Sequence, residues 1–368
     1  MKKFLAAALA AFFAVFLLVC PKAASAAVSE AISACLEIIV PSLFAFSAVS
    51  VYLQKSGIYR IVLKPFTFVL SKILRFDEEI CGIFLLSNIG GFPVGITLIS
   101  ALQAENRISR KDAGRLLCCC FGSGPSFVIG IVGARVFGAI EFGAAIFAAC
   151  FLSSIIIAVI VRARGEIVLK PAPQKLSLTS QTFVSSVNAA ARAMFSVCVM
   201  ITGFSVIAAA MREIGLNALA ETLFADFNLG ENSGAILPAI LDVTRVKDVL
   251  PTKNAAAICA GLLSFGGVCV FLQVSALSDG VPLAKFLLSR LPAAALSSAL
   301  ASVFTQSLPV AAQAIAAANP ALPQNLGLSL CTLAMCAILL NEERSGRSGS
   351  VTLRSSRRAP RSSRSRGV

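Results

Sequence analysis

The chain has 368 residues and a formal charge of +14, and 57% of its residues are hydrophobic but only 14% are charged, where soluble domains carry about 25% charged residues. This composition excludes a soluble protein and indicates one whose solvent is lipid. Because the sequence has no histidine, it excludes Ser-His-Asp and Cys-His catalysis and histidine-ligated metal sites. Eight arginines follow Glu343 in a segment without acids, so we attribute the charge to this tail and to basic loops, and expect no nucleic-acid partner.

Residues 1–27 have the pattern of a secretory signal, because Lys2 and Lys3 precede an apolar run and small residues end it. Taken alone, the pattern fits a cleaved signal and a retained apolar helix equally well.

Further apolar segments follow, several of them about 20 residues long, the length a helix needs to cross roughly 30 Å of hydrocarbon. In chain order they are residues 31–53, 58–74, 81–102, 116–137, 139–161, 183–211, 234–250, 255–277, 286–308 and 326–340.

The sequence therefore predicts an all-α, polytopic helical membrane protein. A polar loop at residues 162–181 divides it, and we expect the serine- and arginine-rich end to be disordered. The expected parts are an N-terminal helix at 1–27, a first half at 28–161, the loop at 162–181, a second half at 182–341 and a tail at 342–368.

Glycine and proline clusters interrupt the apolar segments in both halves. They are GGFPVG at residues 90–95, GSGP at 122–125 and FGG at 265–267. At membrane depth, backbone that leaves a helix is tolerated only where protein shields it or where it lines a cavity. The clusters therefore predict broken or re-entrant helices.

The two halves also resemble each other. The pattern Leu-Leu-Ser, a glycine pair, valine and Ser-Ala-Leu occurs at residues 85–102 and again at 262–277. Paired segments of this kind indicate a transporter site at the interface of two repeats. We interpret the halves as two gate-like repeats; a chance likeness between two apolar helices is the alternative.

Basic segments lie at residues 107–115 and 162–175, in the tail and at the N-terminus. The positive-inside rule places all of them in the cytoplasm. Both ends of the chain would then lie on one side, which implies an even number of crossings.

Ionisable and polar side chains are rare within the apolar segments, and such groups mark functional sites. Asp242 is the strongest candidate, and its alternative is an ion pair with Arg245 or Lys247 at a helix end. The amide of Gln273 can donate and accept hydrogen bonds. Asn88 and Ser123 offer the equivalent groups in the first half.

No group of residues supports an enzymatic reaction. The sequence has no Walker loop and no GxSxG. Its twelve cysteines are scattered through apolar stretches without a CxxC pair, so we expect small buried side chains rather than metal ligands or disulfides. We expect a protein that is not an enzyme and has no catalytic residue, metal or cofactor.

A series of motifs resembles the sporulation integral membrane proteins of the YlbJ type, which carry nucleoside-recognition gate domains and look distantly like concentrative nucleoside transporters. The resemblance covers roughly residues 17–308. Asp242 stands where the family has glutamate, Val246 replaces a glycine, and Phe121-Gly122 precede Ser-Gly-Pro where the family has asparagine. The motifs are PSLFAF at 41–46, GGFPVG-ITL at 90–98, RISRKDAGRLL at 107–117, GSGPSFVIG at 122–130, LDVT at 241–244 and GGVCVFLQVSAL at 266–277.

The resemblance implies a retained N-terminal helix and a transporter-like protein of endospore formation, in the mother-cell-derived membrane around the forespore. It implies passage of dipicolinate, whereas the residues alone support only a small polar or anionic solute. A nucleoside-type transporter is one alternative. A non-transporting scaffold for spore-envelope assembly, docking through the polar loop and the tail, is another.

We predict a solute site formed by both halves, with membrane lipid as a further partner. A carboxylate would repel an anionic solute, so we expect Asp242 to hold a coupling cation or proton, or to position the neighbouring backbone. The predicted site residues are Asn88, Gly90, Gly91, Pro93, Gly95, Ser123, Gly124 and Pro125 from the first half, and Asp242, Thr244, Gly266, Gly267 and Gln273 from the second.

Overall fold

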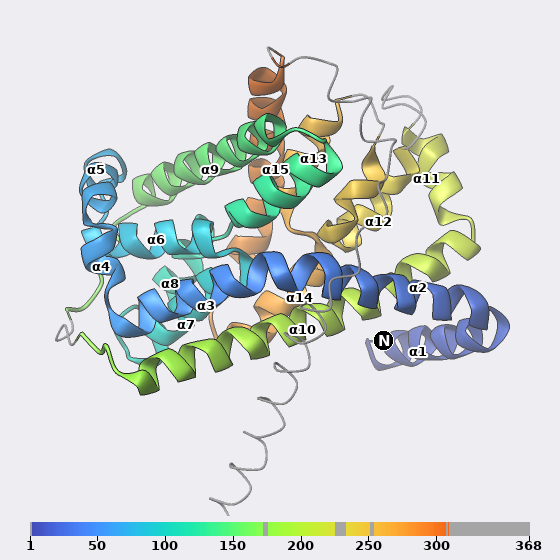
Figure 1. Ribbon diagram of the computed structural model, residues 1–368, viewed down its shortest axis with the longest axis horizontal. Helices are drawn as coiled ribbons and strands as arrows, with labels where there is room; N and C mark the ends of the chain where they lie inside the picture. Colours follow the sequence, from blue (N-terminus) through green and yellow to red (C-terminus); the bar gives the residue numbers. More distant parts are fainter. Residues whose placement is uncertain (1, 172–175, 225–232, 251–253, 307, 309–368) are drawn as a thin grey trace, which may run out of the picture. The chain divides into compact units, whose positions relative to one another are not determined.

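A computed structural model describes residues 2–171, 176–224, 233–250, 254–306 and 308. Every regular element in these ranges is a helix, which confirms the all-α prediction for this part of the chain (Figure 1). The apolar segment predicted at residues 326–340 and the tail lie outside the described residues. The predicted even number of crossings therefore stays a prediction.

The helices are named here in chain order. They are α1 (Lys2–Val19), α2 (Pro21–Ala34), η1 (Cys35–Ile39), α3 (Val40–Ser56), α4 (Tyr59–Val62), α5 (Lys64–Leu74), α6 (Glu78–Gly90), α7 (Phe92–Ala104), α8 (Arg110–Leu116), η2 (Ser126–Val136), α9 (Ile140–Ala163), α10 (Ser180–Glu213), α11 (Leu216–Phe224), η4 (Ser233–Ala235), α12 (Ile236–Leu241), η5 (Val243–Val249), α13 (Ala255–Phe265), α14 (Gly267–Leu277) and α15 (Ala284–Thr305).

Among the described residues, five helical stretches are long and apolar enough to cross a membrane. Large apolar side chains on them face outward, including Val49, Val199 and Leu288, as expected where lipid is the solvent. The protein is therefore a multi-pass membrane protein. The five stretches are Pro21–Ser56, Ile140–Ala163, Ser180–Glu213, Ala255–Leu277 and Ala284–Thr305.

Two helices break at the predicted glycines. Gly91, with φ 87° and ψ 179°, separates α6 from α7. Gly266, with φ 93°, separates α13 from α14. Both dihedral pairs lie where residues with a Cβ are rare, so these positions need glycine. We refer to α6–α7 and α13–α14 as the two broken helix pairs.

Three further predicted apolar segments are also interrupted. Residues 58–74 form the short helices α4 and α5, with Pro65 in the first turn of α5. Residues 116–137 become helical only from Ser126, after the GSGP loop. Residues 234–250 form η4, α12 and η5. Proline and glycine stop or restart the helix in each case.

The broken helix pairs pack against each other. Helix α14 contacts α7, and the Ser100 hydroxyl donates to the Leu277 carbonyl oxygen at 2.9 Å. Helix α3 lies along α10 (Figure 1), and α15 packs on α9 and α13. The elements that carry the predicted site residues are thus brought together. The interpretation of the halves as repeats stays a prediction.

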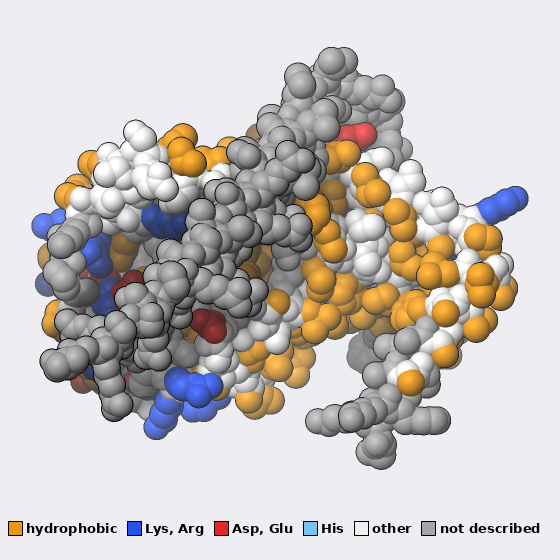
Figure 2. Space-filling view, turned by 90° about the horizontal axis from the view of Figure 1, so that it is seen from below, with side chains coloured by type: hydrophobic (Ala, Val, Ile, Leu, Met, Phe, Trp, Pro, Cys, Tyr) orange, Lys and Arg blue, Asp and Glu red, His pale blue; other side chains and the backbone are white. Residues whose placement is uncertain are grey.

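The basic segment of the first half, residues 107–115, meets the basic polar loop that begins at residue 162. Arg107 donates to the Lys170 carbonyl at 3.1 Å. Arg115 is buried and donates to the carbonyls of Val161 at 2.9 Å and Gly165 at 2.7 Å. Figure 2 shows Lys and Arg side chains gathered at the end of the molecule where α4 and α5 lie. The placement of this end in the cytoplasm stays a prediction.

Arg290 of α15 is the largest side chain that is fully buried in the described residues, with 2% exposure. Its guanidinium donates to the carbonyl oxygens of Cys118, before the GSGP loop, and Ser264, at the end of α13. It also lies 4.8 Å and 4.9 Å from the ring centres of Phe121 and Phe286, a cation–π distance. One side chain therefore satisfies the backbone beside two helix breaks.

We predict that Arg290→Ala lowers the free energy of unfolding by roughly 3 kcal/mol, because two buried carbonyls lose their donor and a cavity opens. Thermal unfolding of purified protein in detergent, followed by the reaction of its buried cysteines with a thiol dye, measures the change. Arg164→Ala is the control, because Arg164 is exposed at the end of α9 and such a change costs about 0.5 kcal/mol or less. Equal midpoints would contradict the role given to Arg290.

Candidate functional site

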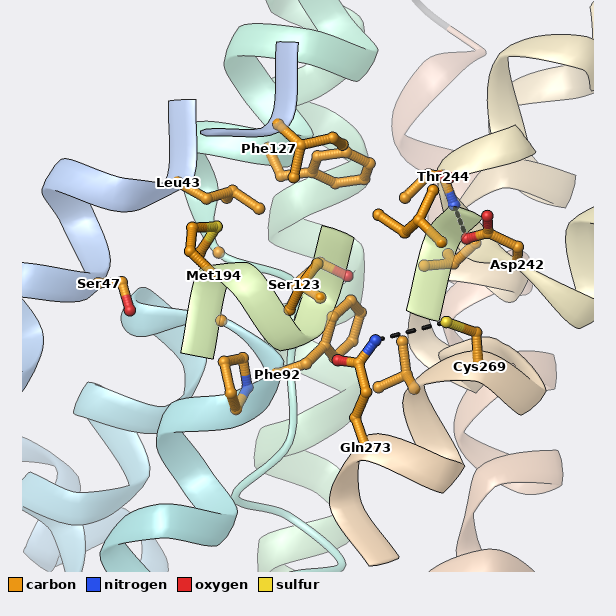
Figure 3. Close-up of a pocket in the computed structure, with 18 of the residues that line it drawn as sticks. Leu43, Ser47, Phe92, Ser123, Phe127, Met194, Asp242, Thr244, Cys269 and Gln273 are labelled. Carbon is orange, nitrogen blue, oxygen red and sulfur yellow. Dashed lines mark hydrogen bonds between the residues drawn. The ribbon is translucent and has the colours of Figure 1, made fainter. Parts of the chain in front are cut away.

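A cavity of about 60 Å³ lies where the breaks of the first half face the second half (Figure 3). The space exceeds what one water molecule needs. Its walls come from η1, α3, α10, the α6–α7 break, the GSGP loop, η5 and α14. We call it the central cavity.

Eight of the thirteen predicted site residues line the central cavity. They come from both broken helix pairs and from the two interrupted segments between them, so the structure brings the two predicted sides together. The eight are Gly90, Gly91, Pro93, Ser123, Gly124, Asp242, Thr244 and Gln273.

Five predicted residues do not line the cavity, and packing explains four of them. Asn88 donates to the Phe84 carbonyl at 2.8 Å. A Cβ added to Gly95 would lie 2.1 Å from the Cys120 carbonyl oxygen, and one on Gly266 would lie 2.6 Å from a carbon of the Phe121 ring. Gly267 approaches the backbone of Ile240 and Leu241 in the same way. Pro125 precedes the first residue of η2. These positions let helices approach closely.

Most of the wall consists of apolar residues that sequence reasoning did not single out. Leu43 and Ser47 lie one helical turn apart on α3. This spacing is the one feature of the sequence that places both residues on the same face of the helix. The apolar helices α3, α10 and α14 give no clear indication in their sequence of which face meets a cavity. The residues that reasoning missed are Ile39, Leu43, Ser47, Phe92, Phe127, Met194, Val197, Ile201, Val243, Cys269 and Val270.

Asp242 is the only carboxylate among the described residues that line the cavity, and it is 1% exposed. It ends α12 and caps η5, because its Oδ1 accepts a hydrogen bond from the Thr244 N–H at 3.0 Å. Its Oδ2 is buried and has no hydrogen-bond partner in the described part of the chain. A buried carboxylate oxygen without a donor is costly, so this atom marks a place for a donor or a cation.

The alternative in which Asp242 pairs with Arg245 or Lys247 is wrong. Arg245 pairs with Asp248 at 3.3 Å, and Lys247 pairs with Glu30 at 3.2 Å. Both bases follow Asp242 on η5, but each has another carboxylate as its partner.

One side of the cavity wall is formed by the first turns of two helices. The first turns of α7 and η2 line it through Phe92 and Phe127, and the two turns meet where a Cβ on Gly124 would lie 3.4 Å from the Gly91 nitrogen. Helix N-termini carry partial positive charge. Part of the N–H groups here is already bonded, since Val94 donates to the Gly91 carbonyl and Phe127 and Val128 donate to the Gly124 carbonyl. This side therefore suits an anionic or acceptor group.

Gln273 and Ser123 supply further polar atoms. The Gln273 side chain is 8% exposed, and its Nε2 donates to the Cys269 sulfur at 3.4 Å. The Ser123 hydroxyl donates to the Leu263 carbonyl at 3.3 Å, which joins the GSGP loop to α13. None of the described residues that line the cavity is lysine or arginine.

The fold and the cavity define a multi-pass helical membrane protein with a buried, mostly apolar cavity between broken helices that contains a few polar groups. The chain is similar to the sporulation integral membrane protein YlbJ of Bacillus subtilis (strain 168), with 28% identity over 148 residues. The match covers 39% of this chain and 36% of the relative, so the chain spans about a third of the length of the protein it matches. No protein-family model matches the sequence, and no solved structure matches it.

We predict that Gly91→Ala lowers the free energy of unfolding by roughly 1–3 kcal/mol, because its φ of 87° and ψ of 179° are open essentially to glycine alone. Gly203→Ala is the matched control, since a Cβ there meets nothing within 4 Å in the interior of α10 and alanine favours a helix. The thiol-dye unfolding assay compares them. A midpoint for Gly91→Ala at or above that of the wild type would contradict the strained break.

Proposed function

We propose that this protein is a membrane transporter of endospore formation that binds a small anionic solute, such as dipicolinate, in the central cavity. The observation that carries the proposal is the unpartnered Oδ2 of Asp242, buried in a cavity whose wall includes the first turns of α7 and η2. The name of the Bacillus subtilis relative supports a place in sporulation. Dipicolinate follows from the family resemblance.

The two sides of the cavity suit two different ions. An anionic group would accept hydrogen bonds at the N-termini of α7 and η2, and a cation or proton would neutralise Asp242. Transporters use freed helix N-termini for anionic substrates and unwound segments for coupling ions in this way. The rings of Phe92 and Phe127 would enclose the apolar body of the solute. Asp242 therefore acts as the ion site rather than as a direct contact of the anion.

Alternating access requires the site to open on each side in turn. The broken helix pairs are the elements that would move, since each has a helix end at its glycine, beside or near the cavity. A shift of α6–α7 against α13–α14 would change access without unfolding either pair. Binding of solute and ion together would favour the closed arrangement.

A nucleoside-type solute is the second candidate. The absence of lysine and arginine from the described lining residues favours a neutral solute, which needs no opposite charge. The amide of Gln273 and the Asp242 carboxylate would bind the base and hydroxyl groups of such a solute.

We predict that Asp242→Asn lowers uptake of dipicolinate into vesicles reconstituted with the purified protein by roughly tenfold or more, because a charge-assisted interaction is worth about 1.5–3 kcal/mol. An imposed pH or sodium gradient should stimulate the wild type and not the variant. Radiolabelled dipicolinate and uridine are measured in parallel.

Asp248→Asn is the matched control, because Asp248 lies on the same short helix, pairs with Arg245 and is partly exposed. We expect its uptake to stay within about twofold of the wild type. Uptake of uridine but not dipicolinate would replace the first solute by the second candidate. Uptake of neither by the wild type would contradict transport of these solutes.

A spore experiment separates the transporter from the scaffold. We predict that the chain restores dipicolinate per spore in Bacillus subtilis that lacks YlbJ, that Asp242→Ala abolishes this, and that deletion of residues 342–368 does not. The reason is that a transporter needs the buried ion site, whereas a scaffold needs its docking surfaces. Immunoblots must show equal membrane levels. Normal dipicolinate in the strain without either protein would overturn dipicolinate as the solute. Loss of function on deletion of residues 342–368, with function retained in Asp242→Ala, would favour the scaffold.

A further inference from the structure

A second cavity, which we call the basic chamber, lies among the ends of α3, α4, α6 and α7. Its volume is about 230 Å³, and polar atoms form much of its wall. Three basic side chains line it: Lys55, Arg60 and Arg107. The central cavity has no such residue among its described lining, so the two spaces differ in charge.

The positive charge of the chamber exceeds the acid that faces it. Arg107 donates to both oxygens of Glu79, at 3.0 Å and 2.8 Å, and Arg60 donates to the same carboxylate. Burial alone would raise the pKa of Glu79, but the hydrogen bonds from Arg107 and Arg60 hold it below its ordinary value. One carboxylate is thus shared by two guanidinium groups, and Glu105, the other acid of the wall, is exposed.

Two further observations show that the described part of the protein does not fully pair these basic groups with hydrogen-bond acceptors or acids. The Nε of Arg60 is buried and has no hydrogen-bond partner in the described part of the chain. The Lys55 ammonium donates only to neutral atoms among its described contacts, the carbonyl oxygen of Ser185 at 3.0 Å and its hydroxyl at 3.4 Å.

The basic chamber and the central cavity lie along the same helices. On α3, Ser47 lines the central cavity and Gln54 lines the chamber, seven residues or about 10 Å apart along the helix. On α6, Gly90 and Ile83 stand in the same relation. Ser50 lies between them and is buried, and a Cβ on Gly90 would come within 3.0 Å of its hydroxyl oxygen.

We infer that the basic chamber is an outer binding site for a small oxyanion, a carboxylate or a phosphate, on the route to the central cavity. The identity of the anion as the transported solute rests on the proposed function; the anion site itself rests on the charges above. Positive charge in a recess raises the local concentration of anions. On this route, the close approach of Ser50 and Gly90 would have to widen for a solute to pass.

Charge-selective labelling of a cysteine placed in the chamber tests the inference. Gln54→Cys protein is reconstituted in vesicles of neutral lipid and reacted with an anionic or a cationic methanethiosulfonate reagent. Mass spectrometry of the peptide that carries residue 54 gives each rate, and wild-type protein gives the background. The ratio of the anionic to the cationic rate reports the local potential.

We expect Lys55→Gln, added to Gln54→Cys, to lower this ratio by roughly fivefold, and Lys55→Arg to restore it, because one unit charge acts on both reagents with opposite sign. Lys72→Gln is the matched control, since Lys72 of α5 does not line the chamber. Millimolar phosphate or dipicolinate should slow labelling of Gln54→Cys, and uridine should not. An unchanged ratio in Lys55→Gln, or equal labelling with and without anion, overturns the site.

The same measurement distinguishes a lipid headgroup from a free anion as the ligand. Together with the uptake assay, it also distinguishes failure of the anion site from failure of the proposed function. Slower labelling in vesicles of anionic lipid without added anion identifies a lipid headgroup phosphate as the ligand, which supports the anion site and overturns its place on a solute route. Protection by dipicolinate together with an absence of dipicolinate uptake retains the anion site and rejects the proposed function. Uptake of dipicolinate without protection of residue 54 retains the proposed function and rejects the anion site.

Discussion

Every backbone N–H and C=O of a membrane protein has to find a partner within the protein, because hydrocarbon offers none. This chain meets the constraint where its helices break, by placing donors beside the freed carbonyls. Arg290 serves the carbonyls of Cys118 and Ser264, and Ser123 serves Leu263. The first turns of α7 and η2, each of which follows an interruption of the helix, line the central cavity. The donors that stabilise the breaks and the polar side of the cavity are therefore parts of one arrangement.

The sequence predicts the helix breaks well, because only glycine accepts the φ angles at Gly91 and Gly266. It also predicts that Asp242 belongs to a cavity, because a buried carboxylate in an apolar segment needs a reason. It does not distinguish a glycine that lines a cavity from one that lets two helices touch. Gly95 and Gly266 are of the second kind. The sequence does not identify Met194 and Ile201 as cavity residues, because an apolar side chain in a helix is equally suited to contact with lipid, protein or a cavity.

The charges are divided between two places, and the division has a physical advantage for a carrier. A basic side chain inside the central cavity would bind an anion strongly in a medium of low dielectric constant and would slow its release. The structure instead places Lys55, Arg60 and Arg107 around a separate cavity with a largely polar wall, and leaves weaker partial charges at the helix ends. Capture and passage can then be tuned by different residues.

The hydrogen bond between Arg290 and the Cys118 carbonyl joins residues 172 positions apart. Chains are made and inserted from the N-terminus, so the segment before the GSGP loop enters the membrane long before its donor exists. Until α15 is synthesised, that carbonyl must be satisfied by water or by another protein. The first half of this chain therefore reaches its final form only when the second half is nearly complete, and a nascent chain stopped before α15 is a natural substrate for membrane quality control.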